Sequence, residues 1–146
     1  DDLTATQRAN ALAKHCNIFT PFTSSRAITE EGVMADGEYI DIIRLSDQLY
    51  DSVINEVAEA LLNPISPLQK TPYTAEGIAT IEAAIRAGLD PYVGTTRGLA
   101  AYTVIVPDID DVSATDKGNR ALTGVEFVAT ITGAIHTVAI AGNVTW

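Results

Sequence analysis

Hydrophobic residues recur at helical spacing in three segments of the chain. The segments cover residues 3–16, 46–63 and 74–89, and each carries one apolar stripe on an otherwise polar surface. Pro64 stops the second segment, because proline lacks the amide that a helix needs. The stripes consist of Ala9, Leu12, Ala13 and Cys16, of Leu49, Val53, Val57 and Leu61, and of Ile78, Ile81, Ile85 and Leu89. The pattern predicts three helices that each bury one face, the second of them against a sheet.

Short apolar runs bounded by turn-forming residues predict strands elsewhere. Four such runs cover residues 17–23, 27–33, 39–43 and 99–106, and Asp36-Gly37 marks a turn before the third. Two further apolar arms, between residues 125 and 140, flank Gly133-Ala134, which fits a two-residue hairpin turn with glycine first. Residues 108–122 are polar and irregular, and residues 143–146 form a strand-like tail.

These elements predict an α/β (α+β) fold. It has a mixed, largely antiparallel sheet of about five or six strands, about three helices and a C-terminal β-hairpin. The chain has 146 residues, 47% of them apolar, so residues 1–146 are expected to form a single domain. Residue 1 is aspartate and the one methionine is Met34, so we expect this domain to be cut from a longer polypeptide.

The charge balance restricts the partners. Nineteen acidic residues against nine lysines and arginines give a net charge of −10 at pH 7. Nucleic acids and anionic membranes both attract clustered cations, so we expect neither as a partner. No apolar run approaches the roughly 20 residues that span a bilayer, so no transmembrane helix is predicted.

Cys16 and the two histidines are the first candidates for chemistry. A single cysteine excludes an internal disulfide and a zinc site with several thiolates. Neighbours on a helix point about 100° apart, so His15 and Cys16 do not form a nucleophile–base pair. Because Cys16 lies on the apolar stripe, we expect a buried thiol that reacts slowly. His136 alternates with apolar residues and is interpreted as structural or interfacial.

Acidic residues are the second group of candidates. Asp108, Asp110, Asp111 and Asp116 resemble a calcium loop in composition, but the glycine and glutamate positions of that motif hold Ser113 and Asn119. Glu56 and Glu59 lie on the polar side of their helix, where solvation explains them. No lipase-type serine motif, phosphate-binding glycine loop or zinc-protease motif occurs. The sequence therefore predicts no catalytic site, no metal site and no cofactor.

The C-terminal strands are the main candidates for assembly, because both of their faces are fairly apolar. An exposed edge of this kind is a hazard unless another chain pairs with it, and strand addition between subunits is one solution. A central hairpin covered by this domain's own helices is an equally open alternative. The residues proposed to contact another subunit are Val125, Phe127, Ile135, Val138, Ile140, Val144 and Trp146.

Several sequence blocks, in this order, resemble a structural family of tailed phages that was long catalogued as a domain of unknown function. The blocks are LTATQ (3–7), CNIF (16–19), EGVMADG (31–37), DIIR (41–44), PYTAEG (72–77) and TITGAIHT (130–137). Members of this family look like contractile tail sheath proteins, and the chain is similar to their C-terminal portion. The N-terminal part of the family pattern is absent.

The resemblance implies a structural virion protein without catalytic activity. Sheath subunits stack as rings around a tail tube and then slide into a shorter, wider lattice, which drives the tube through the host envelope. The implied partners are other copies of the chain, the tail tube protein, and the baseplate and tail terminator proteins. The implied location is the phage tail of the virion, assembled in the host cytoplasm. The alternative is a non-contractile tail or baseplate protein that shares the domain; a tail-associated hydrolase is disfavoured by the missing catalytic residues.

Overall fold

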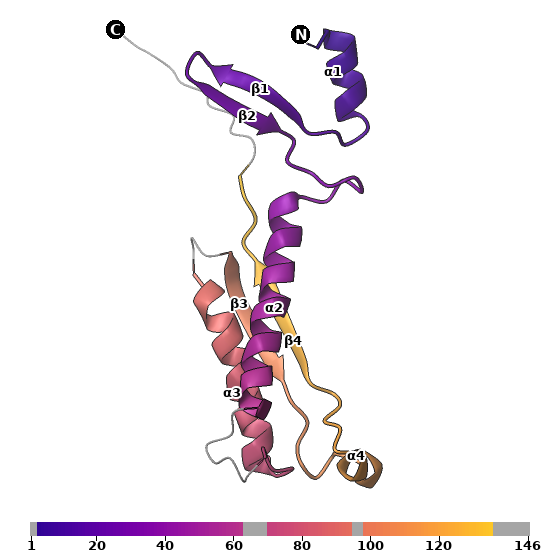
Figure 1. Ribbon diagram of the computed structural model, residues 1–146, viewed down its shortest axis with the longest axis vertical. Helices are drawn as coiled ribbons and strands as arrows, with labels where there is room; N and C mark the ends of the chain where they lie inside the picture. Colours follow the sequence, from indigo (N-terminus) through magenta and orange to yellow (C-terminus); the bar gives the residue numbers. More distant parts are fainter. Residues whose placement is uncertain (1–2, 63–69, 95–97, 136–146) are drawn as a thin grey trace, which may run out of the picture.

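Helices and small antiparallel sheets alternate along the chain, as the period changes in the sequence indicate. The computed structural model describes residues 3–62, 70–94 and 98–135. The elements are α1 (Ala5–Leu12), β1 (Ile18–Thr23), β2 (Arg26–Glu30), α2 (Ile40–Leu62), α3 (Ala75–Leu89), the 3-10 turn η1 (Asp90–Tyr92), β3 (Leu99–Ile105), α4 (Ala114–Asn119) and β4 (Glu126–Ile131). Figure 1 shows this α+β arrangement, with two separate two-stranded sheets, β1–β2 and β3–β4. The predicted α+β class is confirmed, but the described strands form two two-stranded sheets instead of the one largely antiparallel sheet of five or six strands that the sequence predicts.

Helix α1 begins where the sequence predicts and ends earlier. The Thr4 hydroxyl accepts a hydrogen bond from the Gln7 amide, and the Gln7 side chain accepts one from the Thr4 amide, a capping box. The helix stops at Leu12 because His15 adopts a left-handed conformation with φ 56°, after which the Cys16 amide donates to the Ala11 carbonyl. The predicted extension to Cys16 is wrong.

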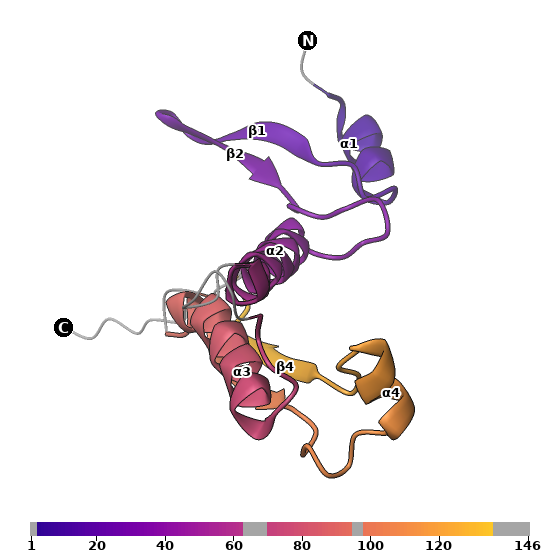
Figure 2. The same cartoon turned by 60° about the horizontal axis from the view of Figure 1, so that its bottom comes forward.

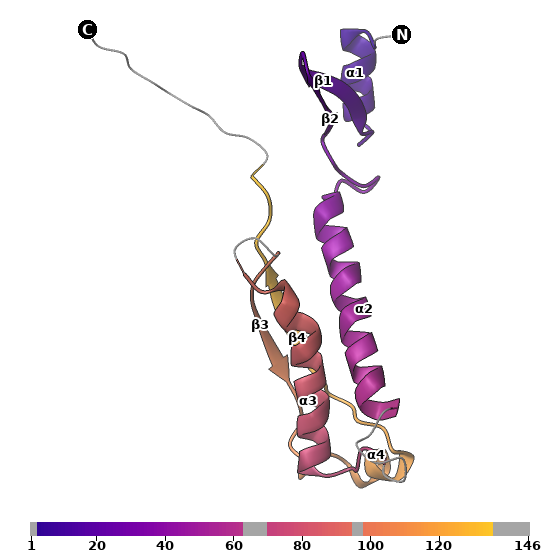
Figure 3. The same cartoon turned by 60° about the vertical axis from the view of Figure 1, so that its left-hand side comes forward.

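The first two predicted strands are confirmed and pair with each other. β1 and β2 form an antiparallel hairpin in which Thr20 lies opposite Ile28. The Arg8 guanidinium, on α1, lies 2.6 Å from the Glu30 carboxylate at the end of β2. At the base of the hairpin, the Asn17 amide group donates to the Val33 carbonyl and accepts from the Val33 amide. Residues 3–33, called here the N-terminal unit, lie beyond one end of α2 (Figure 3).

Residues 39–43 do not form the predicted strand, because α2 begins at Ile40. The Ile43 amide donates to the Tyr39 carbonyl, and half-buried Ile42 and Leu45 extend the apolar face that continues to Leu49. A run of five residues fits both a strand and one helical turn, and contact with the rest of the molecule decides between them. Asp41 in the first turn suits the positive end of the helix dipole.

The core lies between α2, α3 and the β3–β4 sheet. Figure 2 shows α2 and α3 side by side, with β4 behind them. The helices cross closely at Gly88, whose carbonyl accepts a hydrogen bond from the Ser52 hydroxyl at 2.9 Å. The buried cluster consists of Leu49, Val53, Ile81, Ile85, Leu89, Leu99 and Val104. The first half of the α2 stripe, Leu49 and Val53, is buried as predicted. The prediction is wrong for the second half, where Val57 is half-buried and Leu61 is 50% exposed.

The third helix and the strand after it match their predictions, whereas the C-terminal part differs. β4 pairs antiparallel with β3, placing Phe127 opposite Val104. Within the predicted irregular segment 108–122, Ser113 caps the short helix α4 by accepting a hydrogen bond from the Asp116 amide. Residues 132–135 form no strand. The rest of the predicted second hairpin arm and the 143–146 tail lie outside the described residues.

Candidate interaction surfaces

The β1–β2 hairpin is the first candidate surface. Within the described residues, β1 and β2 pair only with each other, so each has an outer edge without a neighbouring strand. Phe19 is 75% exposed and Phe22 70% exposed, and Ile28 is also exposed. Aromatic side chains on an unpaired sheet mark a surface that another chain can cover. The apolar pattern of the sequence predicts these strands but not the exposure of their aromatic side chains.

A groove along α2 is the second candidate surface. A cavity of about 600 Å³ lies between α2 and β4, and one of about 880 Å³ lies between the end of α2, the start of α3 and α4. The two share Leu61, Ile81, Arg120 and Leu122, so they form one depression, which we call the α2 groove. Its apolar wall includes three exposed side chains of α2: Tyr50, Ile54 and Leu61.

Hydrogen bonds fix the walls of the groove. The Tyr73 hydroxyl donates to the Ala121 carbonyl at 3.0 Å, which ties the segment before α3 to the segment after α4. The Thr71 hydroxyl donates to the Ala60 carbonyl at 2.9 Å, near the end of α2. These bonds join residues that lie 48 and 11 positions apart in sequence, so the sequence alone did not reveal the groove.

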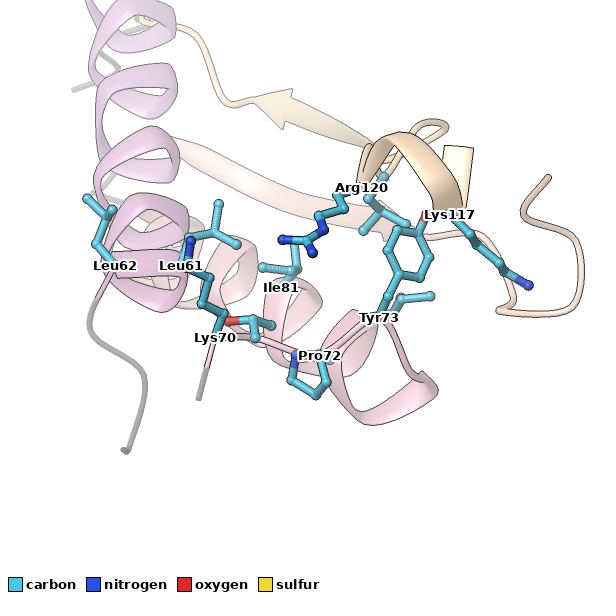
Figure 4. A pocket seen from close by; sticks show the side chains of 12 residues that line it. Leu61, Leu62, Lys70, Pro72, Tyr73, Ile81, Lys117 and Arg120 are labelled. Atoms are coloured by element: carbon cyan, nitrogen blue, oxygen red, sulfur yellow. The ribbon is translucent and has the colours of Figure 1, made fainter. Parts of the chain in front are cut away.

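Three cations line the larger of the two cavities, beside α4, which we call the deeper end of the groove. They are Lys70, Lys117 and Arg120, and none forms an ion pair with another described residue. Figure 4 shows Arg120 extended toward Ile81, while Lys117 points outward from α4. Arg120 caps α4 in a left-handed conformation with φ 55°. No acidic residue of the described chain lines this deeper cavity, in contrast to the acidic character of the molecule.

The assembly residues predicted from the sequence are only partly described. Val125 and Phe127 are half-buried against the core of their own chain, where the Phe127 and Tyr50 ring centroids lie 5.5 Å apart. Both also line the α2 groove. Ile135 is 86% exposed. The remaining members lie outside the described residues: Val138, Ile140, Val144 and Trp146, together with His136.

The prediction of a buried Cys16 is wrong. The thiol is exposed, because Cys16 follows the end of α1 instead of lying on its apolar stripe. His15 is exposed as well, and its ring lies over Gly37: a Cβ atom there would stand 3.1 Å from His15 Cε1. Because of the left-handed turn at His15, neither side chain is part of the helix that the sequence predicts over residues 3–16.

The acidic residues have local structural roles. The Asp108 carboxylate accepts a hydrogen bond from the Asp110 amide, and the Asp116 carboxylate accepts one from the Ser113 hydroxyl. Glu56 and Glu59 are exposed, as their place on the polar side of α2 predicts. Across the described ranges, no three His, Cys, Asp or Glu side chains converge to form a metal site. Among the described helices, none has both the length and the apolar character needed to cross a bilayer.

A polar cluster joins the end of α3 to β3. The Tyr102 hydroxyl donates to the Asp90 carboxylate at 2.5 Å, and this hydrogen bond, with lesser desolvation, raises the pKa of Tyr102 above its ordinary value. The Arg86 guanidinium donates to Glu82 one turn earlier, and that bond raises the pKa of Arg86. The Glu82–Arg86 pair lies within α3, whereas the Tyr102–Asp90 hydrogen bond joins β3 to the end of α3, and we call this bond the latch.

Neither a family model nor a curated protein matches this chain. The two surfaces and the resemblance of the sequence blocks are therefore what indicates a function for this chain. Both surfaces are apolar, and both are built on regular elements. Surfaces of this kind bind macromolecular segments.

Proposed function

We propose that the chain is a structural subunit of a contractile phage tail sheath, corresponding to the C-terminal portion of that protein. The observation that carries the proposal is the β1–β2 hairpin, with its unpaired edges and its exposed Phe19 and Phe22. An open sheet of this kind suits a self-assembling lattice, because a strand from another copy can extend it. The ordered sequence blocks support the same assignment.

Strand addition suits a lattice that must move without coming apart. Main-chain hydrogen bonds would join the donated strand to an unpaired outer edge of the hairpin. The domains can then slide and rotate while the joined strands hold neighbouring copies together. The proposed partners are other copies of the chain, the tail tube protein, and the baseplate and terminator proteins, within the virion.

The proposed role requires no catalysis. Contraction draws on interfaces with two stable arrangements, so the energy is stored in the extended lattice when it assembles. The residues predicted to contact other subunits beyond Ile135 stay a prediction, and so does the role of residues 143–146 in polymerisation.

Electron microscopy of the purified protein tests the proposal. We expect rings or tubes from the wild type, and their loss when Phe19 and Phe22 are both replaced by serine. Both side chains are exposed, so the replacement leaves the core intact. Val128→Ser, on the exposed side of β4, is the matched control and should still polymerise. The proposal fails if the wild type forms no polymer, or if the double variant assembles normally.

The alternative, a non-contractile tail or baseplate protein, also fits an adhesive hairpin. The two functions differ in copy number, because a sheath must be among the most abundant proteins of the particle. Quantitative protein analysis of purified particles separates them: many copies per tail support the sheath, and a few copies support the alternative.

A further inference from the structure

The α2 groove is an apolar surface that the described part of its own chain leaves open. Tyr50, Ile54 and Leu61 follow one another at spacings of about one and two helical turns, so these exposed side chains lie on one side of α2. The groove is long and open, which suits a chain segment better than an enclosed small molecule. We therefore expect its occupant to be a chain segment with apolar side chains.

The hairpin at the other end of the molecule has the complementary properties. Figures 1 and 3 show the N-terminal unit beyond the first residues of α2, and α4 near the last residues of that helix. The larger cavity is lined by residues of that second end, among them Leu62 and Lys117. With this arrangement, the hairpin of a chain does not lie in the groove of the same chain. Phe19 and Phe22 of a second copy are available for that contact.

The dimensions of the two surfaces agree. The six residues of β1 extend about 20 Å at roughly 3.3 Å per residue. The stretch of α2 from Tyr50 to Leu62 extends about 18 Å at 1.5 Å per residue. A hairpin laid along α2 therefore spans the groove from one end to the other.

The charges of the two surfaces are opposite. Residues 27–41 contain five carboxylates and no lysine or arginine: Glu30, Glu31, Asp36, Glu38 and Asp41. Glu30 is paired with Arg8, and the other four are exposed. They lie at and beyond the base of the hairpin. The deeper end of the groove presents Lys70, Lys117 and Arg120, so charge favours an orientation with the hairpin base at that end.

We propose that the α2 groove of one copy binds the β1–β2 hairpin of the next copy. The hairpin tip lies toward Tyr50, its base lies toward Leu62, and the acidic segment 31–41 faces Lys117 and Arg120. This contact joins two different surfaces, so it repeats from copy to copy and builds a ring or a helical filament. The inference rests on the proposed function in taking another copy as the partner.

Cross-linking through cysteines tests the contact and its direction. Native Cys16 is exposed just before β1, at the hairpin base, and Leu62 is exposed at the end of α2. We expect the Leu62→Cys variant, treated with a short bismaleimide, to give a ladder of dimers, trimers and longer products. The wild type, with one thiol, gives dimers at most. Glu56→Cys, on the polar side of α2, is the matched control and should give no ladder.

Charge reversal tests the acidic and basic partners. In the Leu62→Cys background, we expect Lys117→Glu with Arg120→Glu to reduce the cross-linked fraction at least severalfold, and Glu31→Lys with Glu38→Lys to do the same. Combining all four reversals should restore it, because the opposite charges are then exchanged. All four positions are exposed, so the folded chain tolerates the changes.

Three results overturn the inference. The first is a ladder no stronger than that of the Glu56→Cys control, and the second is a combined variant that stays as weak as its parents. The third is strong dimerisation of Leu62→Cys after Cys16→Ser, which would show that two grooves face each other. If tubes form while the ladder is absent, this contact is wrong and the proposed function stands. If tubes are also absent, both are wrong.

Discussion

At the scale of single residues, Cys16 shows how one backbone conformation decides a side chain's environment. The helix that the spacing predicts forms as far as Leu12, but its predicted buried stripe is wrong, because Ala9 and Ala13 are exposed and Leu12 is only half-buried. The left-handed residue His15 then turns the chain, and Cys16 enters solvent. Nothing in the apolar pattern marks this turn, because lysine, histidine and cysteine are all compatible with a helix.

We therefore expect Cys16 to react readily with a thiol reagent in the folded protein. The reaction should be stoichiometric under native conditions and accelerate only modestly in denaturant, since the thiol is already accessible. A chromogenic disulfide reagent measures both rates. Reaction that begins only when the protein unfolds would contradict the exposed position.

At Gly88, α2 and α3 pack so closely that no space is left for a side chain. A Cβ atom there would stand 2.9 Å from the Val53 Cα atom, and the neighbouring backbone of α2 has no easy way to move. We expect Gly88→Ala to destabilise the fold by about 1–3 kcal/mol in denaturant unfolding, because the core is overpacked. Gly118→Ala, in open space on α4, is the control and should be neutral or slightly stabilising. Equal effects of the two would show that α2 and α3 pack more loosely.

At the scale of elements, the sequence predicts those whose apolar period is long. The 3.6-residue period identifies α3 over its whole length and most of α2. It fails at residues 39–43, because a run of five residues fits both the period of a strand and that of a helix. It also misses α4, since the Ser113 cap is the one signal for a helix of only six residues. The groove could not be predicted, because it depends on hydrogen bonds that join the segment before α3 to α2 and to the segment after α4, and these residues are distant in sequence.

Alanine substitutions at the two ends of the α2 stripe should lower the free energy of unfolding by different amounts. Leu49 is 3% exposed, so we expect Leu49→Ala to cost about 2–5 kcal/mol, the transfer free energy plus a cavity. Leu61 is 50% exposed and faces the groove, so Leu61→Ala should cost less than about 1 kcal/mol. Chemical denaturation of the unassembled chain measures both. A large loss at Leu61 would mean that the groove is closed within the single chain.

The stabilisation that the latch between α3 and β3 provides should decrease at alkaline pH. The protonated Tyr102 hydroxyl donates to Asp90, and that hydrogen bond raises the pKa of Tyr102. The stabilisation is therefore complete below the ordinary tyrosine pKa of about 10 and is lost as the pH rises through the higher folded value. Ultraviolet titration should show a late-ionising tyrosine that Tyr102→Phe removes and Asp90→Asn shifts to lower pH. An unchanged titration in Tyr102→Phe would contradict the latch.

At the scale of the whole molecule, apolar patterning predicts which residues avoid water but not which chain covers them. Val125 and Phe127 are half-buried against their own core and also line the α2 groove, so their predicted contact with another subunit stays a prediction. Phe19 and Phe22 were predicted only as strand residues, and they are exposed. The distinction depends on which elements the chain itself brings together, and a single sequence does not contain that information directly.

The distribution of the core gives a final prediction about stability. The buried hydrophobic residues, apart from Val33, all lie between Leu49 and Val112, whereas the described N-terminal unit has a two-stranded sheet and one short helix. A two-stranded hairpin is at best marginally stable in water, so its amides should open more often than those of the core. We expect hydrogen exchange in the unassembled chain to be fast in β1 and β2 and slow in α3 and β3. In polymers, β1 and β2 should gain protection because another copy covers them. Slow exchange of the hairpin before assembly would show that the N-terminal unit is stable without a partner, and the apolar surface at Phe19 and Phe22 would then need a different explanation.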